Sequence, residues 1–164
     1  MASRATSDRR PVALKLTAFR GLSLATAVAV YVLIVVGGVV SSTGSGLACP
    51  DWPLCRGQVI PALTLSVLIE FTHRVWTIAV TILVVATTLF AWRKYRWRSR
   101  LTKLSTLTFV LLLCQIILGM ITVNTRTPPI AVTSHLALAT LVFASALTTS
   151  VIAMLCDSRG MRTR

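Results

Sequence analysis

Four long runs of apolar residues divide the chain, and polar or charged segments separate them. Each run is near or above the ~20 residues that a helix needs to cross the hydrocarbon layer of a membrane. The pattern predicts an all-α integral membrane protein, a bundle of four transmembrane helices in a single domain over residues 1–164. The spans are expected over about residues 21–42, 63–92, 102–123 and 130–156, and a long loop over about residues 44–62, the cysteine loop.

The distribution of charge predicts the topology. The chain is 55% hydrophobic and carries a formal net charge of +13, which in a soluble protein would suggest binding to nucleic acid. Fourteen of the 17 Lys and Arg residues lie in the two tails or in the segment from Arg93 to Lys103, and the others are Arg56, Arg74 and Arg126. Because positive residues remain on the cytoplasmic side, both termini are expected in the cytoplasm, and nucleic acid is not an expected partner.

The first run follows several basic residues and could be mistaken for a secretory signal. At about 22 residues it is longer than the apolar part of such a signal, so we interpret it as an uncleaved first helix. Gly37 and Gly38 near its end would permit the close approach of a neighbouring helix.

Three ionisable side chains stand near the start of the second run, in the segment Ile69-Glu70-Phe71-Thr72-His73-Arg74. Glu70 and His73 are three residues apart, so on a helix they share one face. His135 occupies a similar position on the fourth run. Polar groups at membrane depth are costly without a partner, which favours a functional site here. The alternative is a hydrogen bond that only locks helices together.

The two histidines are expected at the same depth. His73 lies 20 residues before Arg93, and His135 lies 22 residues before Asp157. At 1.5 Å per residue these separations place them about 30 and about 33 Å above the cytoplasmic boundary, near the outer edge of the hydrocarbon. The second and fourth helices run in the same direction. Matching depth is what two axial ligands of one haem iron require.

The cysteine loop carries Cys49 and Cys55, with five residues between them, two of which are proline. The topology places the loop outside, where a disulfide would close a small rigid lid over the bundle. A structural staple and a redox-active or substrate-contacting pair both remain open. Neither histidine lies in the loop to complete a zinc site, and no Cys-x-x-Cys-His motif supports covalent haem attachment. Cys114 and Cys156 are interpreted as small apolar residues.

The two helix pairs resemble a weak internal repeat. Residues 37–43 end the first helix much as residues 119–125 end the third, and a loop and a histidine follow in each case. Only the first copy has the cysteine loop and a glutamate near its histidine. The pattern predicts a pseudo-two-fold axis along the membrane normal, with asymmetric chemistry supplied by the first pair.

The segment Gly46-Leu47-Ala48-Cys49-Pro50-Asp51-Trp52-Pro53-Leu54-Cys55, followed by Gly57, Pro61 and the segment from Glu70 to Arg74, resembles the haem A synthase family. The resemblance extends from about Val36 to His135. It implies oxidation of a porphyrin methyl group of haem O to the formyl group of haem A, for haem-copper oxidases. By this resemblance Glu70 matches the essential glutamate, His73 and His135 match the substrate-haem ligands, and Cys49 with Cys55 match the outer-loop cysteines.

The resemblance has one departure. The usual family member has eight spans in two similar halves, the second of which binds haem B, whereas this chain resembles the catalytic half alone. A homo-oligomer, most simply a dimer, is therefore expected. The expected location is the cell membrane, with the site towards its outer face. Beyond the lipid bilayer and the haems, the candidate partners are a haem O synthase and a quinone or another electron acceptor.

Each residue of the predicted site has an expected role. Glu70 would accept protons or stabilise positive charge on the oxidised carbon, and His73 with His135 would hold the iron. Arg74 is a candidate contact for a haem propionate, with lipid phosphate as the alternative. Two other functions use some of these residues. A bis-histidine membrane cytochrome b carrying electrons from quinol would need only the histidines, and a small transporter or assembly factor would need only Glu70 as a proton site.

Overall fold

Four long helices make up most of the chain. The computed structural model describes residues 9–62, 64–95 and 99–162, and its side chains from Thr17 to Leu155 within those ranges. The helices are α1 (Arg9–Ser42), α2 (Leu65–Lys94), α3 (Arg100–Asn124) and α4 (Pro129–Arg162), and a short 3-10 helix η1 (Ser45–Leu47) follows α1. No strand occurs in these ranges. Each long helix contains a segment long and apolar enough to cross a membrane, which confirms the prediction of a four-helix membrane protein.

The helix ends differ from the expected spans in an instructive way. α1 begins at Arg9 and α2 ends at Lys94, beyond the apolar residues, because hydropathy marks the part of a helix inside the hydrocarbon and not the end of its hydrogen bonding. α2 begins later than expected, after Thr64, whose hydroxyl accepts a hydrogen bond from the backbone N–H of Val67 at 3.4 Å. Ser99 caps α3 in the same manner.

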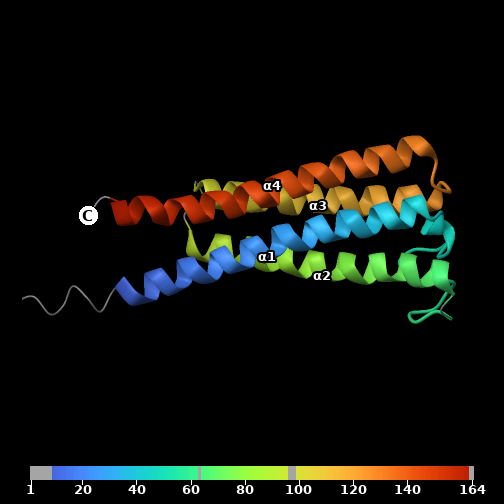
Figure 1. Ribbon diagram of the computed structural model, residues 1–164, viewed down its shortest axis with the longest axis horizontal. Helices are drawn as coiled ribbons and strands as arrows, with labels where there is room; N and C mark the ends of the chain where they lie inside the picture. The colour runs from blue at the N-terminus through green and yellow to red at the C-terminus, as the bar shows by residue number, and fades with distance from the viewer. Residues whose placement is uncertain (1–8, 63, 96–98, 163–164) are drawn as a thin grey trace, which may run out of the picture.

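The helices form a closed bundle in which α2 and α4 lie on a diagonal. α1 packs against α2 and α4, and α3 packs against the same two helices. Figure 1 shows that α1 begins and α4 ends at the end of the bundle where α2 connects to α3. The cysteine loop and the turn between α3 and α4 lie at the opposite end. α2 and α4 therefore run in the same direction, as the sequence predicts.

The centre of the bundle is apolar. Small and branched side chains from all four helices form one buried cluster, consisting of Ala29, Val30, Val80, Val84, Leu112 and Val142. Association of helices in lipid depends on close packing rather than on escape from water, and small side chains allow the backbones to approach. The cluster thus joins all four helices in the interior of the bundle.

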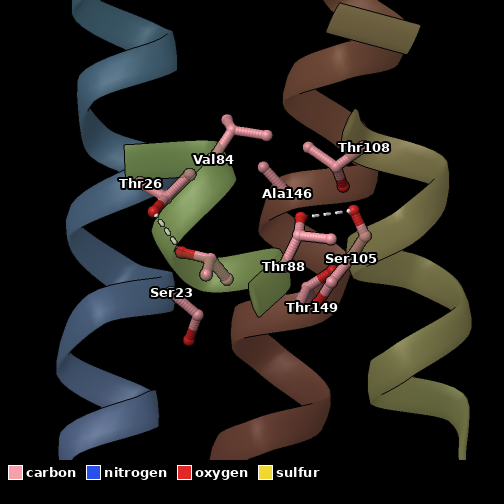
Figure 2. Close-up of a pocket in the computed structure, with 9 residues that line it drawn as sticks. Ser23, Thr26, Val84, Thr88, Ser105, Thr108, Ala146 and Thr149 are labelled. Atoms are coloured by element: carbon pink, nitrogen blue, oxygen red, sulfur yellow. Dashed lines mark hydrogen bonds between the residues drawn. The ribbon is translucent and has the colours of Figure 1, made fainter. Parts of the chain in front are cut away.

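Hydroxyl groups hold the helices together in the next layer. A small cavity of about 10 Å³, large enough for about one water molecule, is lined mainly by serine and threonine side chains from all four helices (Figure 2). Thr26 of α1 and Thr87 of α2 share a hydrogen bond at 2.8 Å, and Thr108 of α3 donates to Ser145 of α4 at 3.0 Å. One hydroxyl–hydroxyl hydrogen bond thus joins α1 to α2, and another joins α3 to α4. The lining residues are Ser23, Thr26, Val84, Thr87, Thr88, Ser105, Thr108, Ala146 and Thr149.

Candidate functional site

A disulfide closes the cysteine loop. Cys49 and Cys55 are bonded to each other and fully buried, which confirms the predicted pairing. Cys55 and Gln58 exchange two backbone hydrogen bonds across a tight turn in which Arg56 and Gly57 have positive φ values of 55° and 73°. Two successive residues with positive φ are typical of the hairpin turn that matches strand twist. The loop is thus a compact folded unit rather than a flexible connection.

The carboxylate of Asp51 supports this turn. It accepts hydrogen bonds from the backbone N–H of Arg56 at 2.5 Å and from that of Gly57 at 2.8 Å. The bond from Gly57 is the main reason that the pKa of Asp51 lies below its ordinary value of 3.8. The Arg56 side chain donates in turn to the carbonyl of Ala48 at 3.1 Å.

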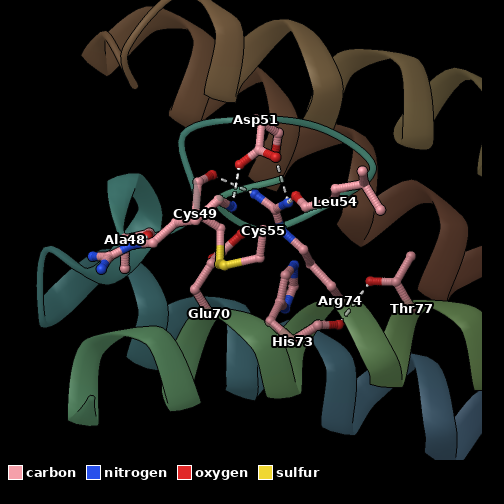
Figure 3. Close-up of polar contacts among 10 residues, drawn as sticks. Ala48, Cys49, Asp51, Leu54, Cys55, Glu70, His73, Arg74 and Thr77 are labelled. Atoms are coloured by element: carbon pink, nitrogen blue, oxygen red, sulfur yellow. Dashed lines mark hydrogen bonds and ion pairs between the residues drawn. A yellow bond between two sulfur atoms is a disulfide. The ribbon is translucent and has the colours of Figure 1, made fainter. Parts of the chain in front are cut away.

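Arg74 of α2 lies inside the cysteine loop. Its guanidinium donates to the backbone carbonyls of Asp51 at 2.6 Å, Leu54 at 2.5 Å and Cys49 at 2.7 Å (Figure 3). Its Nε donates to the carboxylate of Glu70, one turn earlier on the same helix, at 2.8 Å. These contacts give Arg74 a role that the sequence did not reveal, which is to anchor the loop to α2. The contact of Arg74 with a haem propionate stays a prediction.

Glu70 is buried beneath the cysteine loop. Its side chain is only 5% exposed, and its ion pair with Arg74 fixes one carboxylate oxygen. A charge removed from water needs such a partner and additional hydrogen bonds around the pair, and the loop carbonyls supply these to the arginine. The carboxylate therefore has a defined position on the face of α2 that also carries His73.

Each predicted ligand histidine packs directly on a glycine of the preceding helix. A Cβ atom at Gly37 would lie 3.1 Å from Cε1 of His73, and one at Gly119 would lie 3.0 Å from Cε1 of His135. Real Cβ atoms rarely come so close to another atom, so only glycine allows these rings their present positions. Gly38, by contrast, has nothing within 4 Å of such an atom. The close approach predicted for the glycine pair is made by Gly37 alone.

Each of the two imidazoles has an unsatisfied ring nitrogen. Nδ1 of His73 and Nδ1 of His135 are buried without a hydrogen-bond partner. Buried polar atoms are usually satisfied, so each of these needs an explanation. Both rings come from the second or third turn of α2 and α4, at the end that carries the cysteine loop. Two neutral imidazoles on facing helices suit the axial positions of a haem iron, so the residues present fit that group.

Sequence reasoning missed one residue that contacts this pair. The amide nitrogen of Gln115 on α3 lies 3.1 Å from Nε2 of His135 and donates to the backbone carbonyl of the same histidine at 3.0 Å. The available signal was a lone amide side chain within an otherwise apolar run. The neighbouring Cys114 is exposed on the helix surface, and the side chain of Cys156 lies outside the described part of α4.

Comparison with known proteins places this arrangement in a family. The sequence model of a family described as cytochrome oxidase assembly protein matches residues 20–66 and 64–159, which include Glu70 and both histidines. Curated relatives that align with the chain include haem A synthases. The chain belongs to the haem A synthase family. The predicted membership is thereby confirmed.

Haem A synthases of several Bacillus species align with this chain. The protein of Bacillus licheniformis is 32% identical over 143 residues, which cover 87% of this chain and 47% of the relative. That of Bacillus pumilus is 35% identical over 132 residues, covering 79% and 43%, and that of Bacillus mycoides is 30% identical over 128 residues, covering 77% and 41%. The chain thus spans less than half the length of these haem A synthases.

Proposed function

We propose that this chain carries the substrate-haem site of a haem A synthase and oxidises a porphyrin methyl group of haem O to the formyl group of haem A. The observation that supports the proposal most directly is the pair of imidazoles on α2 and α4, each packed on a glycine at the end of the bundle nearest Glu70. Family membership supports the same reaction class, an oxidoreductase of haem A biosynthesis.

His73 and His135 would hold the iron from opposite faces of the ring. Their helices are parallel and diagonal, so a planar molecule between them would contact side chains of all four helices. Oxidation of a methyl to a formyl group removes four electrons, which a quinone or another electron acceptor would take up, and the formyl oxygen would come from water or O₂. The porphyrin, when bound, would delocalise the positive charge or unpaired electron that develops on the methyl carbon. The task of the two histidines is to fix which edge of the ring faces Glu70.

Glu70 would accept the protons that leave the methyl carbon, or stabilise positive charge there. Its carboxylate is buried on the same face of α2 as His73, one turn away. Arg74 holds that carboxylate through Nε and excludes water by drawing the cysteine loop over it. A carboxylate fixed in a dry site acts on a developing charge without reorganising first. Arg74 is therefore a positioning residue for Glu70 in this proposal.

We further propose that the site lies towards the outer face of the cell membrane. The basic segments flank the bundle end where α1 begins and α4 ends, so that end would be cytoplasmic. The cysteine loop would then face the oxidising exterior, which suits its disulfide. A haem O synthase and a quinone remain candidate partners. Self-association also stays a prediction, which mass determination of the detergent-solubilised protein would test.

Extraction of the bound haem tests the proposed function. The protein is expressed beside a source of haem O, purified, and its haem identified by chromatography and mass spectrometry. We expect haem O, hydroxylated intermediates or haem A. Haem B alone would support the bis-histidine electron carrier instead. Replacement of His73 or His135 should remove the low-spin absorption of a bis-imidazole haem, because each change deletes one axial ligand. An unaltered low-spin spectrum in both single variants would overturn the ligand assignment.

A further inference from the structure

Gln115 is placed to control one of the two histidines. The side chain projects from α3 towards α4, and its amide nitrogen contacts both Nε2 and the backbone carbonyl of His135, at 3.1 and 3.0 Å. The amide oxygen is buried without a partner. A buried acceptor left unsatisfied is costly, so the unpaired oxygen of Gln115 needs an explanation.

The orientation of the amide follows from the backbone carbonyl. A carbonyl oxygen only accepts, so the atom of Gln115 at 3.0 Å from it must be the nitrogen, because a rotated amide would bring two oxygens together. The same nitrogen contacts Nε2 of His135 with its second hydrogen. Nε2 must therefore accept, and the proton of the neutral imidazole belongs on Nδ1.

The lone pair that accepts from Gln115 is the one that a metal would use. A neutral histidine ligand with a proton on Nδ1 coordinates through Nε2. His73 has no such contact, since among the described residues no hydrogen bond reaches its Nε2. The residue of α1 that corresponds to Gln115 is Leu33, because each lies nine residues before the last residue of its helix, Ser42 and Asn124. Leu33 packs on the apolar core cluster and offers no donor.

We propose that the amide of Gln115 occupies the coordinating nitrogen of His135 until haem enters, so that iron binds His73 first and His135 second. Gln115 keeps His135 in the ligating tautomer and must move off Nε2 before the second bond forms. This inference rests on the proposed haem site. The net strength of one hydrogen bond corresponds to roughly a twofold to tenfold effect on the second step.

Rapid mixing of the apo protein with haem B in detergent separates the two steps. The wild type should show a five-coordinate haem first and a slower conversion to the low-spin, six-coordinate form. Gln115→Leu, which reproduces the residue of α1, should accelerate that conversion by roughly twofold to tenfold. Gln115→Met, of similar length, should do the same. The mirrored variant Leu33→Gln is the matched control and should slow the first phase instead.

The tautomer gives a readout that does not depend on haem. In the apo wild type, nitrogen NMR of labelled histidine should show a protonated Nδ1 and an accepting Nε2 at His135, and the Nε2 signal should shift in Gln115→Leu. An unchanged second-phase rate in both Gln115 variants would overturn the inference while leaving bis-histidine ligation intact. Loss of low-spin haem in both variants would also overturn it, because the amide would then support ligation rather than delay it. A wild type that never forms low-spin haem would instead contradict the proposed function.

Discussion

The pair α1–α2 and the pair α3–α4 pack their histidines in the same way, but the residues that flank the two histidines in the sequence differ. In both pairs the histidine ring packs on a glycine of the preceding helix, at Gly37 and at Gly119. Ser23 and Thr26 also have the spacing of Ser105 and Thr108, and both pairs of residues line the same cavity. The pseudo-two-fold repeat itself stays a prediction, which expects such correspondences.

The difference lies in the residues that flank each histidine. Glu70 stands three residues before His73, where the second pair has Val132, and Arg74 follows His73, where the second pair has Leu136. The first pair has the disulfide-closed cysteine loop, and the second has a short turn before α4. A similar packing of the two histidines is thus combined with ionisable side chains beside His73 only.

Removal of Arg74 should have the largest effect, because it destroys what distinguishes the first pair. Arg74→Ala leaves the carboxylate of Glu70 buried without its ion pair and frees three loop carbonyls. Breaking a buried pair in this way costs about 3–5 kcal/mol. Unfolding in denaturing detergent and proteolysis of the cysteine loop would measure the loss. Arg126→Ala, at an exposed position of the other turn, is the control, and equal losses in both variants would contradict the anchoring role.

Substitution of the two glycines tests the feature that the pairs share. Gly37→Ala and Gly119→Ala should each push a histidine ring by a few tenths of an ångström and reduce low-spin haem several-fold, because an added Cβ would lie 3.1 or 3.0 Å from the ring. Gly38→Ala meets nothing within 4 Å and should bind haem normally. Absorption spectra of the three purified variants give the answer. A loss confined to one of the two pairs would break the proposed correspondence.

Protonation of Asp51 should have the smallest effect, a loss of stability confined to the cysteine loop of the first helix pair. The pKa of this carboxyl is lowered in the folded protein, so its contribution is complete above the unfolded pKa of about 3.9 and is lost as pH falls through the lower folded value. Asp51→Asn should abolish this part of the acid sensitivity. Hydrogen exchange of the Arg56 and Gly57 amides, which donate to Asp51, would report it. Identical acid profiles in the variant and the wild type would argue against the capping role.

The sequence predicted the elements that depend on local pattern. Apolar runs near spanning length identified the four helices, and counting turns from the charged ends placed His73 and His135 at one end of the bundle. The disulfide could also be predicted from the sequence, because Cys49 and Cys55 lie in one short loop. In each case a period, a length or a short separation was sufficient.

The contacts that the sequence did not reveal depend on long-range geometry. Arg74 recognises backbone carbonyls 20 to 25 residues away, and a carbonyl has no side-chain signature. Gln115 of α3 contacts His135 of the neighbouring helix α4, and this contact depends on which face of α3 points into the bundle. The glycines that contact the histidine rings can be seen in the sequence, but only the packing shows that the ring of His73 lies against Gly37 and not against Gly38.

The most direct test of the central claim is the haem produced by Glu70→Gln. Glutamine keeps an oxygen that can accept from Nε of Arg74, so the cysteine loop and the low-spin haem should change little, but it cannot take a proton at neutral pH. Both forms are expressed beside a haem O source, and haem products are measured per bound haem. We expect the variant to accumulate haem O or a hydroxylated intermediate. A normal yield of haem A would contradict the assignment of Glu70 as the acid-base residue.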